Sequence, residues 1–268
     1  MLNLQTKINS KAQERIMLIN DDILNAFPAI SLEDMGKVRL MNRIDTKYVT
    51  TVDKIVELLH QASSEYFIQQ IDGRKNMPYY TRYYDTADAN MYYEHQRGKK
   101  TRQKIRVRQY EESDTPPFVE IKKKNNKGRT RKKRVSMTAG KTLDGYSEFI
   151  EDHSNYDTES LRPHIENHFY RITLVNKDMT ERITIDSDLE FHNLVNDHRE
   201  KLDGIGIIEW KRDGSNDKSR LDSMLKDLRI KQSGFSKYCI GMALTDSDLR
   251  QNRLKKKLRM IKRLGGSE

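Results

Sequence analysis

The sequence has one cysteine and no long hydrophobic run, and these shortages narrow the classes of protein that it can encode. The single thiol, Cys239, excludes an internal disulfide and fits a reducing compartment. No apolar stretch reaches the length of a transmembrane helix, and the first residues do not resemble a secretory signal. We therefore expect a soluble, cytoplasmic protein.

The short motifs of several enzyme classes are also missing. The sequence has no GxGxxG or P-loop, no HExxH or CxxC, and no GxSxG. It shows no repeat at the period of a solenoid. No local motif therefore indicates a nucleotide-binding loop, a zinc site of these types or a serine nucleophile.

Charge is the property that the chain has in abundance. Charged residues make up 34% and hydrophobic residues 35% of the 268 positions, so the core is modest for this length. Regular alternation and aromatic residues nevertheless argue against disorder. The 50 Lys and Arg residues exceed the 40 Asp and Glu residues, and the net charge is +10. Such an excess indicates a polyanionic partner: nucleic acid, an acidic membrane surface or a phosphate compound.

Strands with one charged face dominate the middle of the chain. In RQKIRVRQY, Lys104, Arg106 and Arg108 share one face of a strand, while Ile105 and Val107 share the other. ESDTPPF and KNNKGRT are typical of hairpin connections. The pattern predicts an α+β fold, an antiparallel β-barrel or strongly curved sheet with flanking helices. The expected strands lie near 43–50, 66–71, 79–85, 102–110, 117–124, 131–137, 168–176, 181–190 and 204–212.

Helical periodicity is expected mainly at the two ends. Residues 1–40 contain an apolar series at Ile16, Ile19, Ile23 and Phe27 that predicts a helix. TVDKIVELLH, which Thr51 can cap, and DKSRLDSMLKDL predict two more. We divide the chain into an N-terminal helical segment (1–37), a barrel domain (38–245) and a basic C-terminal helix (246–268).

The charged strand faces allow two arrangements. If the apolar faces point inward, the charges coat the outside, which is the common arrangement and leaves no pocket. If the charges point inward, helices must cover the apolar face and the lumen becomes a tunnel of Lys and Arg. The second arrangement is costly without a bound anion, because desolvated like charges repel one another.

An ordered set of segments resembles the VTC domain, the catalytic domain of the vacuolar transporter chaperone polyphosphate polymerases, in the CYTH or triphosphate tunnel superfamily. The resemblance covers roughly residues 38–245 and favours the inward-facing charges. Its segments are NRIDTKYV (42–49), YYDT (83–86), MYYEHQRGKKTRQKIRVRQY (91–110), VEIKKK (119–124), RITIDSDLEF (182–191), IIEWK (207–211) and FSKYCIG (235–241).

The resemblance implies a tunnel that binds triphosphate or polyphosphate, with a divalent cation, Mn²⁺ or Mg²⁺, held by glutamate. The implied catalytic cations are Lys47, Arg106, Arg108, Lys122, Arg171 and Lys237. Further phosphate contacts would come from Lys104, Lys124, Arg182, Lys211 and Ser236. The implied metal ligands are Glu209 and Glu120.

The implied activity is transfer of the γ-phosphate of ATP to a growing polyphosphate chain. Phosphoryl transfer needs alignment and charge neutralisation more than covalent help, and guanidinium and ammonium groups supply both. Two alternatives stay open: a triphosphatase acting on inorganic or nucleoside triphosphate, and a non-catalytic module that binds polyphosphate or nucleic acid. Sequence-specific nucleic-acid binding is not expected, because no recognition-helix motif occurs and a narrow tunnel would not admit a duplex.

Two departures from the family patterns bear on the reaction. Hydrolases of this superfamily usually carry ExExK on the first strand, but the matching residues here are Arg43, Asp45 and Lys47. A cation in place of the first carboxylate weakens the case for a second metal and favours transfer over hydrolysis. Gly234 stands where eukaryotic members have an extra lysine, which puts the affinity for a long chain in doubt.

Several residues have a structural explanation that competes with a functional one. Asp45 either binds metal or only pairs with a neighbouring arginine. Asp186 and Asp188 are either metal ligands or part of a strand end with a turn. His95 is expected to be a hydrogen-bonding residue at a helix end. Trp210 and the tyrosine pairs at 79–80, 83–84 and 92–93 are expected to pack the barrel.

The C-terminal segment LRQNRLKKKLRMIKRL predicts a basic helix with Leu254, Leu258 and Ile261 on one face. Such a helix either rests on an acidic membrane or a partner, or packs its apolar stripe back on its own domain. The chain lacks the membrane spans and the SPX domain of eukaryotic relatives, so the resemblance also implies a separate membrane partner.

Overall fold

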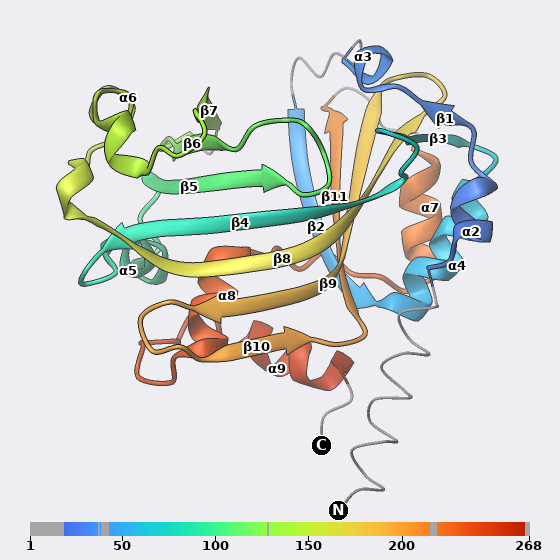
Figure 1. The fold of residues 1–268 in the computed structure, drawn as a ribbon. Coiled ribbons are helices and arrows are strands. Elements are labelled where there is room, and N and C mark those ends of the chain that lie inside the picture. The colour runs from blue at the N-terminus through green and yellow to red at the C-terminus, as the bar shows by residue number, and fades with distance from the viewer. Residues whose placement is uncertain (1–18, 37, 39–42, 128, 215–218, 266–268) are drawn as a thin grey trace, which may run out of the picture.

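A computed structural model describes residues 19–36, 38, 43–127, 129–214 and 219–265. One curled, almost wholly antiparallel sheet forms the body of the protein, with helices at both ends (Figure 1). Its main strands, in spatial order, are β2 (Arg43–Thr51), β11 (Ile205–Asp213), β9 (Glu181–Asn193), β8 (Leu161–Asn176), β4 (Asn76–Thr86), β5 (Arg102–Tyr110), β6 (Phe118–Lys124) and β7 (Thr130–Ser136). Shorter strands extend it: β3 (Tyr66–Gln69) on β8, β1 (Ala29–Ile30) parallel to β3, and β10 (Arg199–Leu202) on β9.

The predicted fold class is confirmed. The hydrogen-bonded path through the described strands begins at β2 and ends at β7, so the sheet is a half-barrel. The helices are α2 (Asp21–Asn25), α3 (Leu32–Met35), α4 (Val52–Ala62), α5 (Asn90–Arg97), α6 (Ser147–His153), α7 (Arg220–Asp227), α8 (Lys237–Thr245) and α9 (Lys255–Gly265).

The strand boundaries follow the alternation except in β8 and β10. We expected a strand only from residue 168, but β8 begins at Leu161 and includes Pro163. The pairing register between β4 and β8 shifts beside this proline, at the step from Tyr83 to Tyr84. A proline is tolerated there because a bulge needs one fewer ladder hydrogen bond. Strand β10 was not predicted, since its sequence, REKL, carries little apolar signal.

The N-terminal expectation needs a correction. Ile16 lies outside the described residues, and the helix that contains Ile23 ends at Asn25. The chain then extends into β1 rather than continuing as a helix, because Phe27 precedes Pro28, and a residue before proline is disfavoured in the α conformation. Ile23 and Phe27 still share one buried cluster with α4, so the apolar series does mark a core-facing segment.

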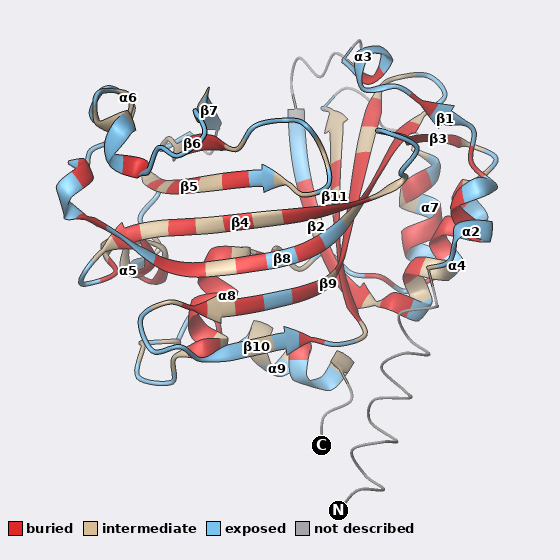
Figure 2. Ribbon diagram, in the orientation of Figure 1, coloured by how far each residue is buried: buried red, intermediate tan, exposed pale blue. Residues whose placement is uncertain are grey.

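The two ends of the sheet have different apolar covers (Figure 2). On the β2–β11–β9–β8 side, Ile208 and Trp210 are buried in one cluster with Leu58 and Leu59 of α4. Thr51 caps α4 as predicted, accepting a hydrogen bond from the Lys54 amide at 3.5 Å. Helix α7, predicted from DKSRLDSMLKDL, packs against α4 in the same cluster.

The C-terminal helix packs back on its own domain. Leu254 and Ile261 are buried in the cluster that contains Ile205 and Ile207, and Leu258 packs against this cluster. This outcome is the packing alternative of the two that the sequence left open. Among the described residues, no helix is long and apolar enough to span a membrane.

Candidate functional site

The charged face of β5 points into the curl of the sheet. Arg106 and Arg108 are only 7% and 8% exposed, and Lys104 donates a hydrogen bond of 2.8 Å to Ser236 at the start of α8. Ile105, on the opposite face, is fully buried in a cluster with Leu143 and Ile150. Of the two arrangements that the sequence allowed, the protein adopts the one with charges inside.

Cross-strand pairing aligns this charge into two rows. Lys104 of β5 lies opposite Lys122 of β6, which lies opposite Lys132 of β7. In the next row, Arg106 lies opposite Glu120, which lies opposite Arg134. Like charges in direct opposition destabilise a sheet unless an anion lies among them.

Glu120 is that anion within the protein. Its carboxylate accepts a hydrogen bond from Arg106 and lies 3.4 Å from the Lys122 ammonium and 3.8 Å from the Lys132 ammonium. Burial raises the pKa of Glu120, but Arg106 and Lys122 outweigh it and bring the pKa to about 2. Arg106 and burial hold the pKa of Lys122 well below its ordinary value. One carboxylate thus serves three cations.

A second carboxylate lies on the other wall of the curl. Glu209 of β11 forms ion pairs with Lys47 of β2, its direct cross-strand partner, and with Lys211 two residues along the same strand. Burial raises the pKa of Glu209, and the two ammonium groups more than offset this and hold it well below the ordinary value. Burial lowers the pKa of Lys211 to about 8.

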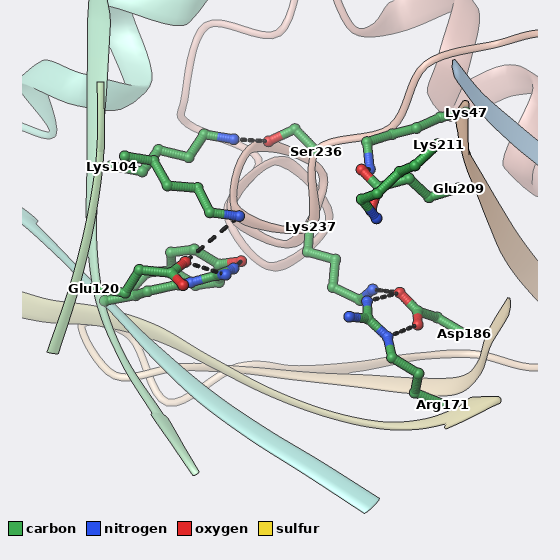
Figure 3. Close-up of polar contacts among 12 residues, drawn as sticks. Lys47, Lys104, Glu120, Arg171, Asp186, Glu209, Lys211, Ser236 and Lys237 are labelled. Carbon is green, nitrogen blue, oxygen red and sulfur yellow. Dashed lines mark hydrogen bonds and ion pairs between the residues drawn. The ribbon is translucent and has the colours of Figure 1, made fainter. Parts of the chain in front are cut away.

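Helix α8 places a third group between the two walls (Figure 3). Ser236 caps this helix by accepting a hydrogen bond from the Cys239 amide at 3.2 Å. Lys237, the first helical residue, forms an ion pair with Asp186 of β9, which also accepts hydrogen bonds of 2.6 and 2.8 Å from the Arg171 guanidinium of β8. Burial lowers the pKa of Lys237 to about 7 although the carboxylate opposes this shift.

Arg108 has little compensation for its charge. Its Nε donates to the Thr81 hydroxyl at 3.2 Å, and its guanidinium lies over the rings of Tyr79 and Phe169, 5.5 and 6.0 Å from their centroids. Within the part of the chain that the structure describes, it has no carboxylate partner. Burial and the nearby Arg106 lower its pKa to about 10. A buried guanidinium held only by rings and a hydroxyl is prepared for an external anion.

The remaining predicted phosphate ligands lie at the ends of the same face. Arg182 pairs in register with Lys211 and is half-buried. Lys124 ends β6 opposite Arg102 and is half-buried. Asp45 also pairs in register with Lys211, and it is exposed.

The two predicted metal ligands lie on opposite walls of the curl. Glu120 belongs to the β6 wall and Glu209 to the β11 wall, and each is held by cations of its own wall. The described residues contain no group of three or more His, Cys, Asp or Glu side chains that could hold a metal ion. A divalent cation would therefore take at most two ligands of these types from the described residues, with its other ligands supplied by phosphate oxygens and water.

Sequence reasoning missed several residues of the site. Lys132 and Arg134 share the inward face of β7, and because residues 131–134 are all basic, only the pairing with β6 distinguishes them from their neighbours. Phe169 lies beneath the Lys237 ammonium, 3.9 Å from the ring centroid, and no sequence pattern marks it. Tyr83 accepts a hydrogen bond of 3.2 Å from Arg106, so its hydroxyl is polar lining rather than simple packing.

The structure also locates three residues for which a structural explanation competed with a functional one. Asp188 is not at a strand end: it has a left-handed backbone (φ +51°) inside β9, and its carboxylate accepts a hydrogen bond from the Ser187 hydroxyl. Trp210 is buried on the face away from the charges, where its indole N–H donates to Glu181 at 2.7 Å. His95 lies in the last turn of α5, which confirms the helix-end position, but its buried Nδ1 has no hydrogen-bond partner among the described residues.

The chain is similar to one protein family and, more distantly, to several solved structures. A family model described as VTC domain matches residues 42–246. No curated protein matches the chain. Among solved structures, a putative adenylate cyclase from Bacillus halodurans is 15% identical, with 73% of this chain and 96% of that chain covered and a TM-score of 0.43. A putative adenylyl cyclase from Hippeastrum, described as having a dominant triphosphatase activity, is 12% identical over 76% and 97%, with a TM-score of 0.47. A mimivirus capping enzyme triphosphatase is 12% identical over 69% and 88%, with a TM-score of 0.34.

Proposed function

The chain belongs to the VTC domain family, and on that premise we propose that it is a metal-dependent phosphotransferase that moves the γ-phosphate of ATP to the end of a polyphosphate chain. The observation that carries this proposal is the excess of inward-facing cations over carboxylates. The cations are Lys47, Lys104, Arg106, Arg108, Lys122, Lys132, Arg134, Arg171, Lys211 and Lys237, and the carboxylates are Glu120, Asp186 and Glu209.

Such an excess is unfavourable in the free protein and becomes favourable when a polyanion enters. Each phosphate oxygen that approaches replaces water lost by a buried guanidinium or ammonium group. The cations come from both walls of the curl and from the first residue of α8 between them. A linear chain of phosphates, or the triphosphate of ATP, can therefore meet positive charge on several sides at once.

In the proposed reaction, a terminal oxygen of the chain attacks the γ-phosphorus of ATP. The bond from that phosphorus to the β,γ-bridging oxygen breaks, and ADP leaves. Arg106 and Arg108 are placed to hold phosphate oxygens by paired N–H groups, and Lys237 is placed to neutralise charge opposite them. A bound Mn²⁺ or Mg²⁺ would neutralise phosphate oxygens further, with Glu209 as its ligand from the protein.

The carboxylates favour a phosphate acceptor over water. Hydrolysis by a metal-activated water requires, besides a metal ligand, a further carboxylate free to orient the water. Glu120, Asp186 and Glu209 are each engaged by at least two cations. A phosphate nucleophile carries its own negative charge and needs no general base, so the site suits transfer.

The test is incubation of the purified protein with ATP and Mn²⁺ or Mg²⁺, followed by gel analysis of chain length and by assay of free phosphate. We expect long chains and ADP. Release of free phosphate without chains would identify a triphosphatase and overturn the proposal. Neither product, with tight binding of polyphosphate, would identify a binding module. The Arg108→Gln variant should lose synthesis, whereas Arg131→Gln, on the outward face of β7, should retain it.

A further inference from the structure

Helix α9 lies beside the basic site rather than apart from it. Its apolar residues Leu254 and Ile261 are buried against the domain, and it packs against β2 and β11. This packing fixes the rotation of the helix about its axis. The cations that flank the buried stripe are therefore held in one place.

The side chain of Lys257, on α9, extends toward the start of α8. Its Nζ lies 3.5 Å from the position that a Cβ on Gly234 would take. Gly234 has φ +63°, a conformation that side chains rarely adopt, and it stands two residues before Ser236, the hydroxyl that Lys104 contacts. The Lys257 ammonium therefore lies beside Gly234, just before the start of α8.

Arg253, in the turn just before α9 and four residues before Lys257, lies against the end of α5. Its guanidinium covers Gly98, and a Cβ at that position would meet Nη1 at 1.6 Å. Gly98 ends α5 with a left-handed backbone (φ +75°). Only a glycine at this helix end allows the arginine so close.

Four cations of this region act on one side chain, His95. Burial, Lys104, Arg102, Lys257 and Arg253 together lower the pKa of His95 to about 3. The imidazole is therefore neutral and adds no charge of its own. Two of these cations belong to β5 and two to the C-terminal segment, so α9 and the inward face of β5 share one electrostatic region.

Among the described residues, neither of the two C-terminal cations, Arg253 and Lys257, has a carboxylate partner. Lys257 is half-buried and Arg253 is exposed. Positive charge thus continues outward from Lys104 without a compensating anion.

We propose that Arg253 and Lys257, here called the α9 rim, bind the phosphates of a polyphosphate chain that extend past the buried cations near Lys104 and Ser236. This inference rests on the proposed function only in taking polyphosphate as the class of substrate. A membrane surface fits less well, because the apolar stripe that would insert between lipids is buried in the domain. The rim adds affinity for long chains and little for a compound of three phosphates.

The test compares two double variants of the full chain. Arg253→Gln/Lys257→Gln removes the rim, and Arg259→Gln/Lys262→Gln removes the same charges from the exposed face of α9. Binding of inorganic tripolyphosphate and of medium-chain polyphosphate is measured by calorimetry at several salt concentrations, without ATP. Flotation with vesicles of acidic phospholipid is measured in parallel, and thermal unfolding checks the fold.

We expect the rim variant to bind medium-chain polyphosphate roughly tenfold more weakly, with a salt slope lower by about one for each lost contact. Its tripolyphosphate affinity should change less than about twofold, and the control variant should match the wild type. Equal losses in the two variants, or equal losses for the two compounds, would overturn the proposal. So would loss of vesicle binding alone, or failure of the wild type to bind polyphosphate. If the wild type binds polyphosphate but makes none from ATP, the proposed function is wrong. The binding measurements on the two variants still decide whether the α9 rim binds polyphosphate.

Discussion

Replacing Asp186 by asparagine removes the one carboxylate that serves Arg171 and Lys237. The Asp186 side chain is 5% exposed, and it receives two hydrogen bonds from the guanidinium and one from the ammonium group. Burial raises the pKa of Asp186, but Arg171 and Lys237 outweigh burial and hold it below the ordinary value. The group is therefore ionised at neutral pH, and its charge is part of the folded structure.

The cost of this substitution follows from what stays behind. Breaking a buried ion pair by removing one partner costs about 3–5 kcal/mol, because an uncompensated charge remains in the interior. An asparagine oxygen still accepts one hydrogen bond, so we expect the lower end, on the order of 3 kcal/mol. For a chain of this size each kcal/mol shifts the melting temperature by about 2–4 °C, which predicts a loss of roughly 10 °C.

The assay is thermal unfolding with and without inorganic tripolyphosphate. The anion should stabilise Asp186→Asn more than the wild type, because it supplies the missing negative charge to Arg171 and Lys237. Asp188→Asn is the matched control: it lies two residues along the same strand, and asparagine tolerates its left-handed backbone. Its free energy of unfolding should change by less than about 0.5 kcal/mol.

Acid provides an independent check. A depressed carboxyl pKa stabilises the folded state above the unfolded pKa, and this stabilisation is lost as the pH falls through the folded value. The stability of the wild type should therefore fall more steeply in acid than that of Asp186→Asn. Equal stability of the two proteins at neutral pH, or an anion effect no larger in the variant, would refute the account of Asp186 as the counter-charge of the site.

Three further predictions concern α8. Lys237 has a pKa of about 7 in the folded protein, so its affinity for tripolyphosphate should fall as the pH rises from 6 to 9. Part of this fall comes from the protein, and calorimetry measures that part. Lys237→Arg should abolish it, because arginine stays charged over this range. Ser236→Ala should cost about 1 kcal/mol of folding stability, because the hydrogen bond from the Cys239 amide to the capping hydroxyl is lost, and it should also weaken phosphate binding. Ser236→Thr should keep the cap. Urea unfolding measures the stability of both variants. Gly241→Ala would place a Cβ 2.5 Å from the Phe191 ring. We expect the folding stability to fall by about 1–3 kcal/mol, and polyphosphate binding to weaken as α8 shifts. Unchanged stability would show that the neighbouring side chains move aside without cost.

Much of the fold could be predicted from strand alternation. The period of two in RQKIRVRQY and in VEIKKK determines that Lys104, Arg106 and Arg108 share a face, and the structure places them as the pattern requires. Helix signals were reliable where a cap residue and an apolar periodicity coincided, as at Thr51. They failed where proline followed the apolar series, as at Phe27, because the local backbone preference outweighs periodicity.

What the sequence by itself determined is which side chains lie on the same face of each strand, since that depends only on local backbone geometry. Only the tertiary structure decided which face turns inward, which carboxylate compensates which cation, and where Lys237 of α8 and Lys257 of α9 lie. Asp186 meets Lys237, and Lys257 lies beside Gly234, through contacts between residues far apart in the chain. Such pairings depend on sheet curvature and helix docking, which are set by the burial of apolar surface over the whole domain and not by any one segment.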